Sequence, residues 1–132
     1  MLGIREPGIY GKQTFADLLA LLEKTAAETG IVIDQYQSNH EGDLVDKIQE
    51  AYQKYDGIVI NPAAYTHTSV AILDALKSVS IPAVEVHISN VDAREAFRQI
   101  SYPGMYCEKT IQGQGLDGYR QAILYLKEKY SK

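Results

Sequence analysis

Several features that often reveal a protein's class are scarce or absent in this chain. There is one cysteine, Cys107, among 132 residues, so we expect no internal disulfide and no cysteine-rich metal site. No apolar run approaches the roughly 20 residues of a membrane-spanning helix, and the start of the chain shows no signal-peptide pattern. These absences favour a cytoplasmic protein.

An excess of positive charge is also missing. The formal net charge is −4 at pH 7, which predicts neither a nucleic acid nor an anionic membrane as partner. The composition, 45% hydrophobic and 23% charged, is that of an ordinary globular protein. Because domains usually contain about 100–200 residues, the length predicts a single domain over residues 1–132.

Helical periodicity alternates with short apolar segments along the chain. The pattern predicts helices at 14–29, 43–55, 68–79, 92–99 and 116–130, and strands at 31–38, 57–61, 82–89 and 109–113. This order predicts parallel βαβ units, with helices on both faces of one sheet. The expected fold is therefore a flavodoxin-like, doubly wound α/β fold. Such a fold begins with a strand that lies inside the sheet, whereas the first element predicted here is the helix at 14–29. We therefore expect the first, central strand of the fold to be absent from the chain.

The segment "VEVHIS" places polar side chains on a strand that should be buried. Alternation directs Glu85, His87 and Ser89 to one face and the intervening apolar residues to the other. Burying a glutamate or a histidine costs free energy unless each finds a partner. Glu85 can accept a hydrogen bond from one ring nitrogen of His87 and leave the other nitrogen for proton transfer. A satisfied structural pair at a strand end is the alternative.

Other polar residues follow the apolar strands, where parallel sheets form their sites. Asn61 ends the segment 57–61, and His67 precedes the helix predicted at 68–79. Both can bind a ligand, or simply shape a turn and cap a helix. Arg94 and Arg98 are four residues apart on one helical face, which suits a carboxylate or hydroxyl ligand as well as a solvated surface.

The segment "GQGLDG" at 113–118 matches the dinucleotide-binding pattern G-x-G-x-x-G. Only 14 residues follow Gly118, which leaves no second strand for the acidic residue that binds the ribose. A glycine-rich turn is therefore the favoured interpretation, and a non-catalytic nucleotide-binding or flavin-binding module the alternative. The histidines His40, His67 and His87 are scattered, so no metal site is expected.

Residues 2–11, "LGIREPGIYG", read as a glycine-rich loop that carries Arg5 and Tyr10. The segments "QSNHEGDLVDKI", "GIVINPAAYTHTSVAILDAL" and "IPAVEVHISNVDAREAFR" follow in order. Across these segments the sequence resembles the type II 3-dehydroquinate dehydratases, or type II dehydroquinases, from Leu2 to about Tyr119. The resemblance implies a hydro-lyase that removes water from 3-dehydroquinate to give 3-dehydroshikimate. It also implies a homododecamer built from trimers, no cofactor or metal, and a place in the shikimate pathway of aromatic amino acid biosynthesis or in quinate catabolism.

The resemblance further implies a role for each matching residue. Tyr10 would remove a proton from the carbon beside the substrate ketone, and Arg5, on the same lid loop at about 3–13, would favour the tyrosinate. His87, oriented by Glu85, would protonate the departing hydroxyl. The implied substrate-binding and supporting residues are Asn61, Ile88 and Ser89 for the carboxylate, His67 and Arg98 for ring hydroxyls, Asp74 for a neighbouring subunit's site, and Arg94 for positive charge near the tyrosine.

The chemistry of these residues agrees with those roles. A free tyrosine has a pKa of about 10 and is a weak base at neutral pH, but nearby arginines favour the phenolate. Removing a proton beside a ketone develops enolate charge, which needs fixed hydrogen-bond donors. The elimination then needs an acid, and histidine titrates in the right range. A loop flanked by glycines suits a lid that closes over substrate and excludes water.

The sequence departs from the family pattern at three places. It starts after the first strand and after the "NGPN"-type turn, whose asparagine helps to stabilise the enolate in the family. Asp92 stands where histidine is common, and "MYCEKTIQG" is more polar than the usual last strand. The first departure leaves an inactive truncated homologue as a second alternative.

Overall fold

The structure is a computed structural model, and it describes residues 15–38, 40–61, 69–88 and 101–130. Its elements, in chain order, are α2 (Phe15–Thr29), α3 (Glu41–Glu50), β1 (Ile58–Ile60), α4 (Val70–Val79), β2 (Ala83–His87), the 3₁₀ helix η4 (Pro103–Met105), β3 (Lys109–Gln112) and α5 (Asp117–Tyr130). The helix predicted at 92–99 lies outside the described residues.

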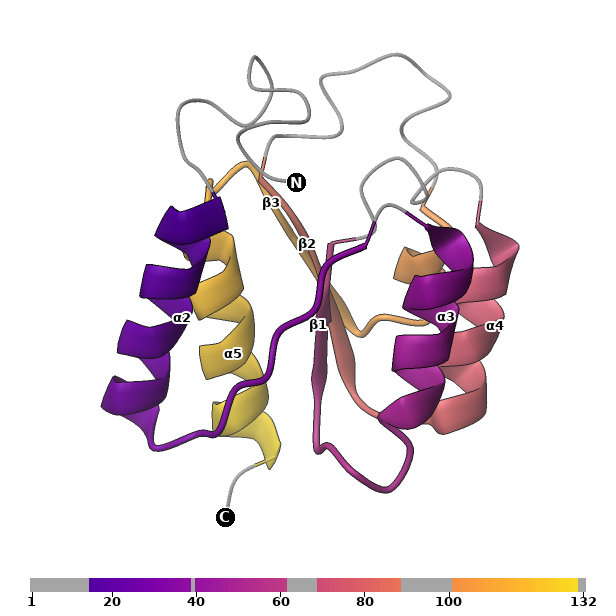
Figure 1. The fold of residues 1–132 in the computed structure, drawn as a ribbon, viewed down its shortest axis with the longest axis horizontal. Coiled ribbons are helices and arrows are strands. Elements are labelled where there is room, and N and C mark those ends of the chain that lie inside the picture. The colour runs from indigo at the N-terminus through magenta and orange to yellow at the C-terminus, as the bar shows by residue number, and fades with distance from the viewer. Residues whose placement is uncertain (1–14, 39, 62–68, 89–100, 131–132) are drawn as a thin grey trace.

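The described strands form one parallel sheet in the order β1-β2-β3. Ile58 of β1 is in register with Ala83 of β2, and Val84 of β2 with Lys109 of β3. Figure 1 shows α2 and α5 on one side of this sheet and α3 and α4 on the other. This arrangement confirms the predicted doubly wound α/β fold, because alternating strands and helices place helices on both faces.

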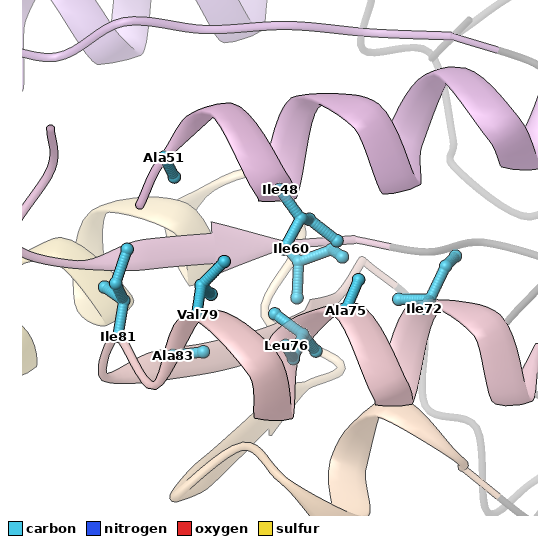
Figure 2. Packing of buried hydrophobic residues seen from close by; sticks show 9 residues of the cluster. All are labelled: Ile48, Ala51, Ile60, Ile72, Ala75, Leu76, Val79, Ile81 and Ala83. Atoms are coloured by element: carbon cyan, nitrogen blue, oxygen red, sulfur yellow. The ribbon is translucent and has the colours of Figure 1, made fainter. Parts of the chain in front are cut away.

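Strand β2 is central and entirely buried. On one face, Val84 and Val86 pack with Ile111 of β3 and Ala122 of α5. On the other face, Ala83 belongs to the core formed with α3 and α4. Figure 2 shows this second core, in which both helices press apolar side chains onto β1 and β2. Its buried members are Ile48, Ala51, Ile60, Ile72, Ala75, Leu76, Val79, Ile81 and Ala83.

The strand predicted at 31–38 is wrong. Within the described part of the chain this segment has no ladder partner, and Figure 1 shows it crossing from the end of α2 to the start of α3. Val32 is 86% exposed, although its apolar character suggested a buried strand. Apolar alternation reports a tendency to extend, but a strand forms only where a neighbour supplies hydrogen bonds.

Helix boundaries follow local chemistry. Gly30, at φ +74°, follows the end of α2, because glycine adopts left-handed backbone without strain. The second helix was predicted to reach residue 55 but stops at Glu50, and Gln53 nearby has a left-handed φ of 59°. The side chain of Ser69 accepts a hydrogen bond from the backbone N–H of Ile72 at 3.0 Å, which caps α4.

Among the described helices, none combines the length and the apolar character that crossing a membrane requires.

Candidate active site

The polar pair of β2 lies on the face predicted from its alternation. Glu85 is 0% exposed and His87 is 8% exposed, and the two alternate along the strand with Val84 and Val86, which pack toward α5. The Nε2 atom of His87 is 2.8 Å from Oε2 of Glu85. This geometry confirms that the two side chains form a buried pair, and it directs Nδ1 of the imidazole away from Glu85.

Two hydroxyl groups complete the surroundings of the Glu85 carboxylate. Ser101 donates a hydrogen bond to Oε2 at 2.5 Å, and Thr110 donates one to Oε1 at 3.0 Å. Ser101 lies two residues before η4, and Thr110 of β3 is in register with Glu85 of β2. We define the Glu85 cluster as Glu85, His87, Ser101 and Thr110.

Ser101 and Thr110 were not predicted as site residues from sequence. The signal for Thr110 was present, because the last strand is unusually polar for a parallel sheet, where burial favours apolar residues. The β2–β3 register explains this polarity, since it places a hydroxyl opposite a buried carboxylate. No comparable signal marks Ser101, whose contact depends on the path of the chain before η4.

Electrostatics favour an ionised Glu85. Burial raises the pKa of its carboxyl group, but hydrogen bonds from His87, Ser101 and Thr110 lower it, and the net pKa lies below the ordinary value of 4.5. The pKa of the nearby Cys107 thiol is instead raised. Burial and the negative charge of Glu85 raise its pKa to about 12, so Cys107 is a neutral thiol and not a nucleophile at neutral pH.

Asn61 lies at the carboxyl end of β1, beside the strand that carries His87. Its side-chain Nδ2 donates a hydrogen bond to the hydroxyl of Tyr119, in the first turn of α5, at 3.0 Å. Tyr119 was also missed from sequence, because 58 residues separate the partners. The contact links the ends of β1 and α5 at the edge of the sheet where parallel α/β folds bind ligands.

The glycine-rich segment 113–118 contributes backbone to the same edge. Gly113 donates its N–H to the carbonyl of His87 at 3.2 Å, and Gly115 donates to the carbonyl of Ile88 at 3.1 Å. Both glycines have positive φ, 76° and 61°, which a residue with a side chain rarely adopts. The segment is therefore a turn that supports the end of β2, as the favoured interpretation had it.

The remaining predicted site residues divide into two groups. Asp74 lies on the exposed side of α4, within a helix whose other face is buried in the core. Six others lie outside the described residues: Arg5, Tyr10, His67, Ser89, Arg94 and Arg98. Among the described residues, no group of three or more histidine, cysteine, aspartate or glutamate side chains could hold a metal ion.

Comparison with known proteins identifies the family to which this site belongs. The model of the family "Dehydroquinase class II" matches residues 1–127. The chain belongs to the class II dehydroquinases.

Individual members of the dehydroquinase family are similar over most of their length. A 3-dehydroquinate dehydratase from Endomicrobium trichonymphae is 52% identical over 93% of this chain and 86% of its own length. Another, from Lachnoclostridium phytofermentans, is 55% identical over 92% of this chain and 85% of its own length. The crystal structure of the type II dehydroquinase from Butyrivibrio crossotus superposes with a TM-score of 0.91, at 54% identity, over 96% of this chain and 88% of that one. These likenesses confirm both the resemblance and the fold class.

Proposed function

We propose an assignment of side chains to the steps of the dehydroquinase reaction in this chain. As a member of its family the chain is a 3-dehydroquinate dehydratase, a hydro-lyase that removes water from 3-dehydroquinate to give 3-dehydroshikimate in the shikimate pathway. The observation that carries the assignment is the buried pair of Glu85 and His87 at the carboxyl end of the central strand. Nothing in the described residues favours the alternatives of an inactive homologue or a nucleotide-binding module.

His87 is the acid of the elimination. Its Nε2–H donates to Glu85, which fixes the ring orientation and favours a positively charged imidazolium. The Nδ1 atom then carries the proton that passes to the departing hydroxyl, which leaves as water. Glu85 keeps its own charge throughout, so its task is to orient and stabilise the imidazolium.

Tyr10 is the base that opens the reaction. Its phenolate takes the proton beside the ketone, and the electrons of the broken C–H bond form an enolate. Arg5 and Arg94 favour the phenolate, because positive charge nearby lowers the pKa of a tyrosine from its ordinary value of about 10. The enolate then returns its electrons to form the carbon–carbon double bond as the hydroxyl departs. Residues 3–13 form the lid that excludes water.

The substrate's polar groups are divided among the remaining residues. Asn61 binds the carboxylate together with Ile88 and Ser89, and its contact with Tyr119 supports this by fixing the amide orientation. His67 and Arg98 hold ring hydroxyls. The exposed position of Asp74 on α4 suits a role in the site of a neighbouring subunit, in a homododecamer of trimers.

We also propose the simplest cellular setting for this chemistry. The chain is a single catalytic domain over residues 1–132, works in the cytoplasm without a metal or another cofactor, and binds only a small substrate and copies of itself. A biosynthetic role and a role in quinate catabolism use the same reaction, so the site serves either one.

The test is a continuous assay of 3-dehydroshikimate by its ultraviolet absorbance. We expect His87→Ala and Tyr10→Phe each to lower kcat by about 100-fold or more, since general acid–base groups contribute roughly 10²–10⁴. The matched control is His40→Ala, which removes an exposed histidine that makes no side-chain capping bond to α3. Near-wild-type turnover in either site variant would overturn the role given to that residue.

A further inference from the structure

Two hydroxyl groups of the Glu85 cluster have no part in the reaction described above. We propose that Ser101 and Thr110 are positioning residues, which hold the carboxylate of Glu85 as a hydrogen-bond acceptor and so keep the proton of the Glu85–His87 pair on the imidazole. The consequence for turnover rests on the proposed role of His87 as the acid, whereas the consequence for the proton's location does not.

Ser101 is oriented toward the carboxylate by its own backbone surroundings. Its Oγ accepts a hydrogen bond from the N–H of Gly104 at 2.9 Å and donates one to Glu85 Oε2 at 2.5 Å. Because the Gly104 N–H already occupies the acceptor side of the hydroxyl, the Ser101 proton points at Glu85. This oxygen of Glu85 is the one that also faces Nε2 of His87.

Thr110 occupies the other carboxylate oxygen. Its Oγ1 donates to Oε1 of Glu85 at 3.0 Å, from the strand position in register with Glu85 itself. Each oxygen of the buried carboxylate therefore receives at least one hydroxyl proton. An ionised carboxylate accepts all of these bonds as a charged acceptor, whereas a protonated one carries an O–H at one oxygen and accepts the hydroxyl bonds more weakly.

The backbone at Gly104, in η4, packs directly against the carboxylate of Glu85 and the hydroxyl of Ser101. A Cβ atom added at Gly104 would approach Oε1 of Glu85 to 2.7 Å and Oγ of Ser101 to 2.8 Å. The carboxylate could not withdraw easily, because it is completely buried and held by the bonds from His87, Ser101 and Thr110. Glycine at this position thus allows the chain to cover Glu85 closely.

The location of one proton then depends on these donors. With a single proton on the pair, either Glu85 is ionised beside an imidazolium, or Glu85 is protonated beside a neutral imidazole. The hydroxyls favour the first state, and each one is expected to shift the ratio about tenfold or more, as hydrogen bonds to charged groups do. Among the described residues, the Cys107 thiol is the other titratable group that interacts with the charge of Glu85. It stays neutral at neutral and acidic pH, because its pKa is raised to about 12.

Histidine nitrogen NMR tests the proposal directly. The chain has three histidines, so ¹⁵N-histidine labelling gives few signals, and those of His87 are assigned by their loss in His87→Gln. In the Ser101→Ala/Thr110→Val double variant, which removes both hydroxyls, we expect the acid-side titration midpoint of the pair to rise by about two pH units. We also expect kcat to fall about tenfold or more while KM stays within about threefold.

The controls separate this role from a loss of fold. The single variant Thr110→Ser retains the hydroxyl and is expected to keep the wild-type midpoint and kcat. Ser78→Ala and Thr29→Val each remove a hydroxyl that bonds only a helix carbonyl or a neighbouring backbone N–H, and should change neither quantity. A wild-type midpoint in the folded double variant would overturn the proposal. A raised midpoint in a protein that lacks dehydratase activity would support the positioning role and contradict only the proposed function.

Discussion

Two glutamates of this protein each receive three side-chain hydrogen bonds, yet their surroundings are opposite. Glu85 is completely buried and is held by His87, Ser101 and Thr110. Glu108 lies on the surface just before β3 and forms, with Tyr125, Lys129 and Tyr130, what we call the Glu108 cluster. The pKa of Glu108 is also lowered, chiefly by its bonds from Lys129 and Tyr130.

The difference lies in what neutralises each charge. Lys129 pairs with Glu108 at 2.6 Å and cancels its charge at the surface, where the cluster joins the last turn of α5 to the start of β3. Among the described residues, Glu85 has no lysine or arginine partner, and its non-histidine donors are neutral hydroxyls. Neutral donors stabilise a carboxylate without cancelling its charge, which therefore remains available to His87. Glu108 therefore joins α5 to the start of β3, whereas Glu85 sets where the proton of its pair with His87 lies.

Removing each charge by an isosteric change should separate the two sites most strongly. We expect Glu85→Gln to lower the free energy of unfolding at pH 7 by about 1.5–3 kcal/mol, because it breaks charged hydrogen bonds in a buried site. Glu108→Gln should lower it by less than about 1 kcal/mol, as for exposed ion pairs. Urea denaturation of both variants measures these free energies of unfolding. Equal losses would show that the two carboxylates contribute equally to stability and would contradict the comparison.

The same experiment has a definite pH dependence. The pKa of Glu85 is lower in the folded state than its ordinary value of 4.5, so its contribution is fully present above that value and is lost as the pH falls through the folded pKa. The gap between wild type and Glu85→Gln should therefore narrow as the pH falls below 4.5. A gap that widens in acid would contradict an ionised Glu85.

A smaller effect is expected at the glycine that lies against the Glu85 cluster. Gly104→Ala should lower the free energy of unfolding by about 1–3 kcal/mol, because the new methyl group overpacks Glu85 and Ser101. Gly42→Ala is the matched control, since a Cβ there meets nothing within 4 Å. In α3 it should be neutral or stabilise by about 0.5–1 kcal/mol. Thermal melts of the two variants give the comparison, and a neutral Gly104→Ala would show that the chain is not held closely over Glu85.

Much of this arrangement was predictable from sequence. Alternation in β2 assigned Glu85 and His87 to one face, and the helical periodicities placed α2, α4 and α5 within a few residues of their ends. Such features depend on neighbours along the chain. The strand expected at 31–38 failed because ladder partners come from elsewhere in the fold. Ser101 and Tyr119 were missed for the same reason, since their contacts join distant segments.

The measurement that tests the account most directly is turnover of 3-dehydroquinate by Glu85→Gln and Glu108→Gln, assayed side by side with folding checked by circular dichroism. We expect Glu85→Gln to lose about 100-fold or more in kcat, because His87 loses the charge that stabilises its imidazolium. Glu108→Gln should remain within about twofold of wild type, as an exposed pair remote from the reaction. A folded Glu85→Gln enzyme with wild-type kcat would contradict the account.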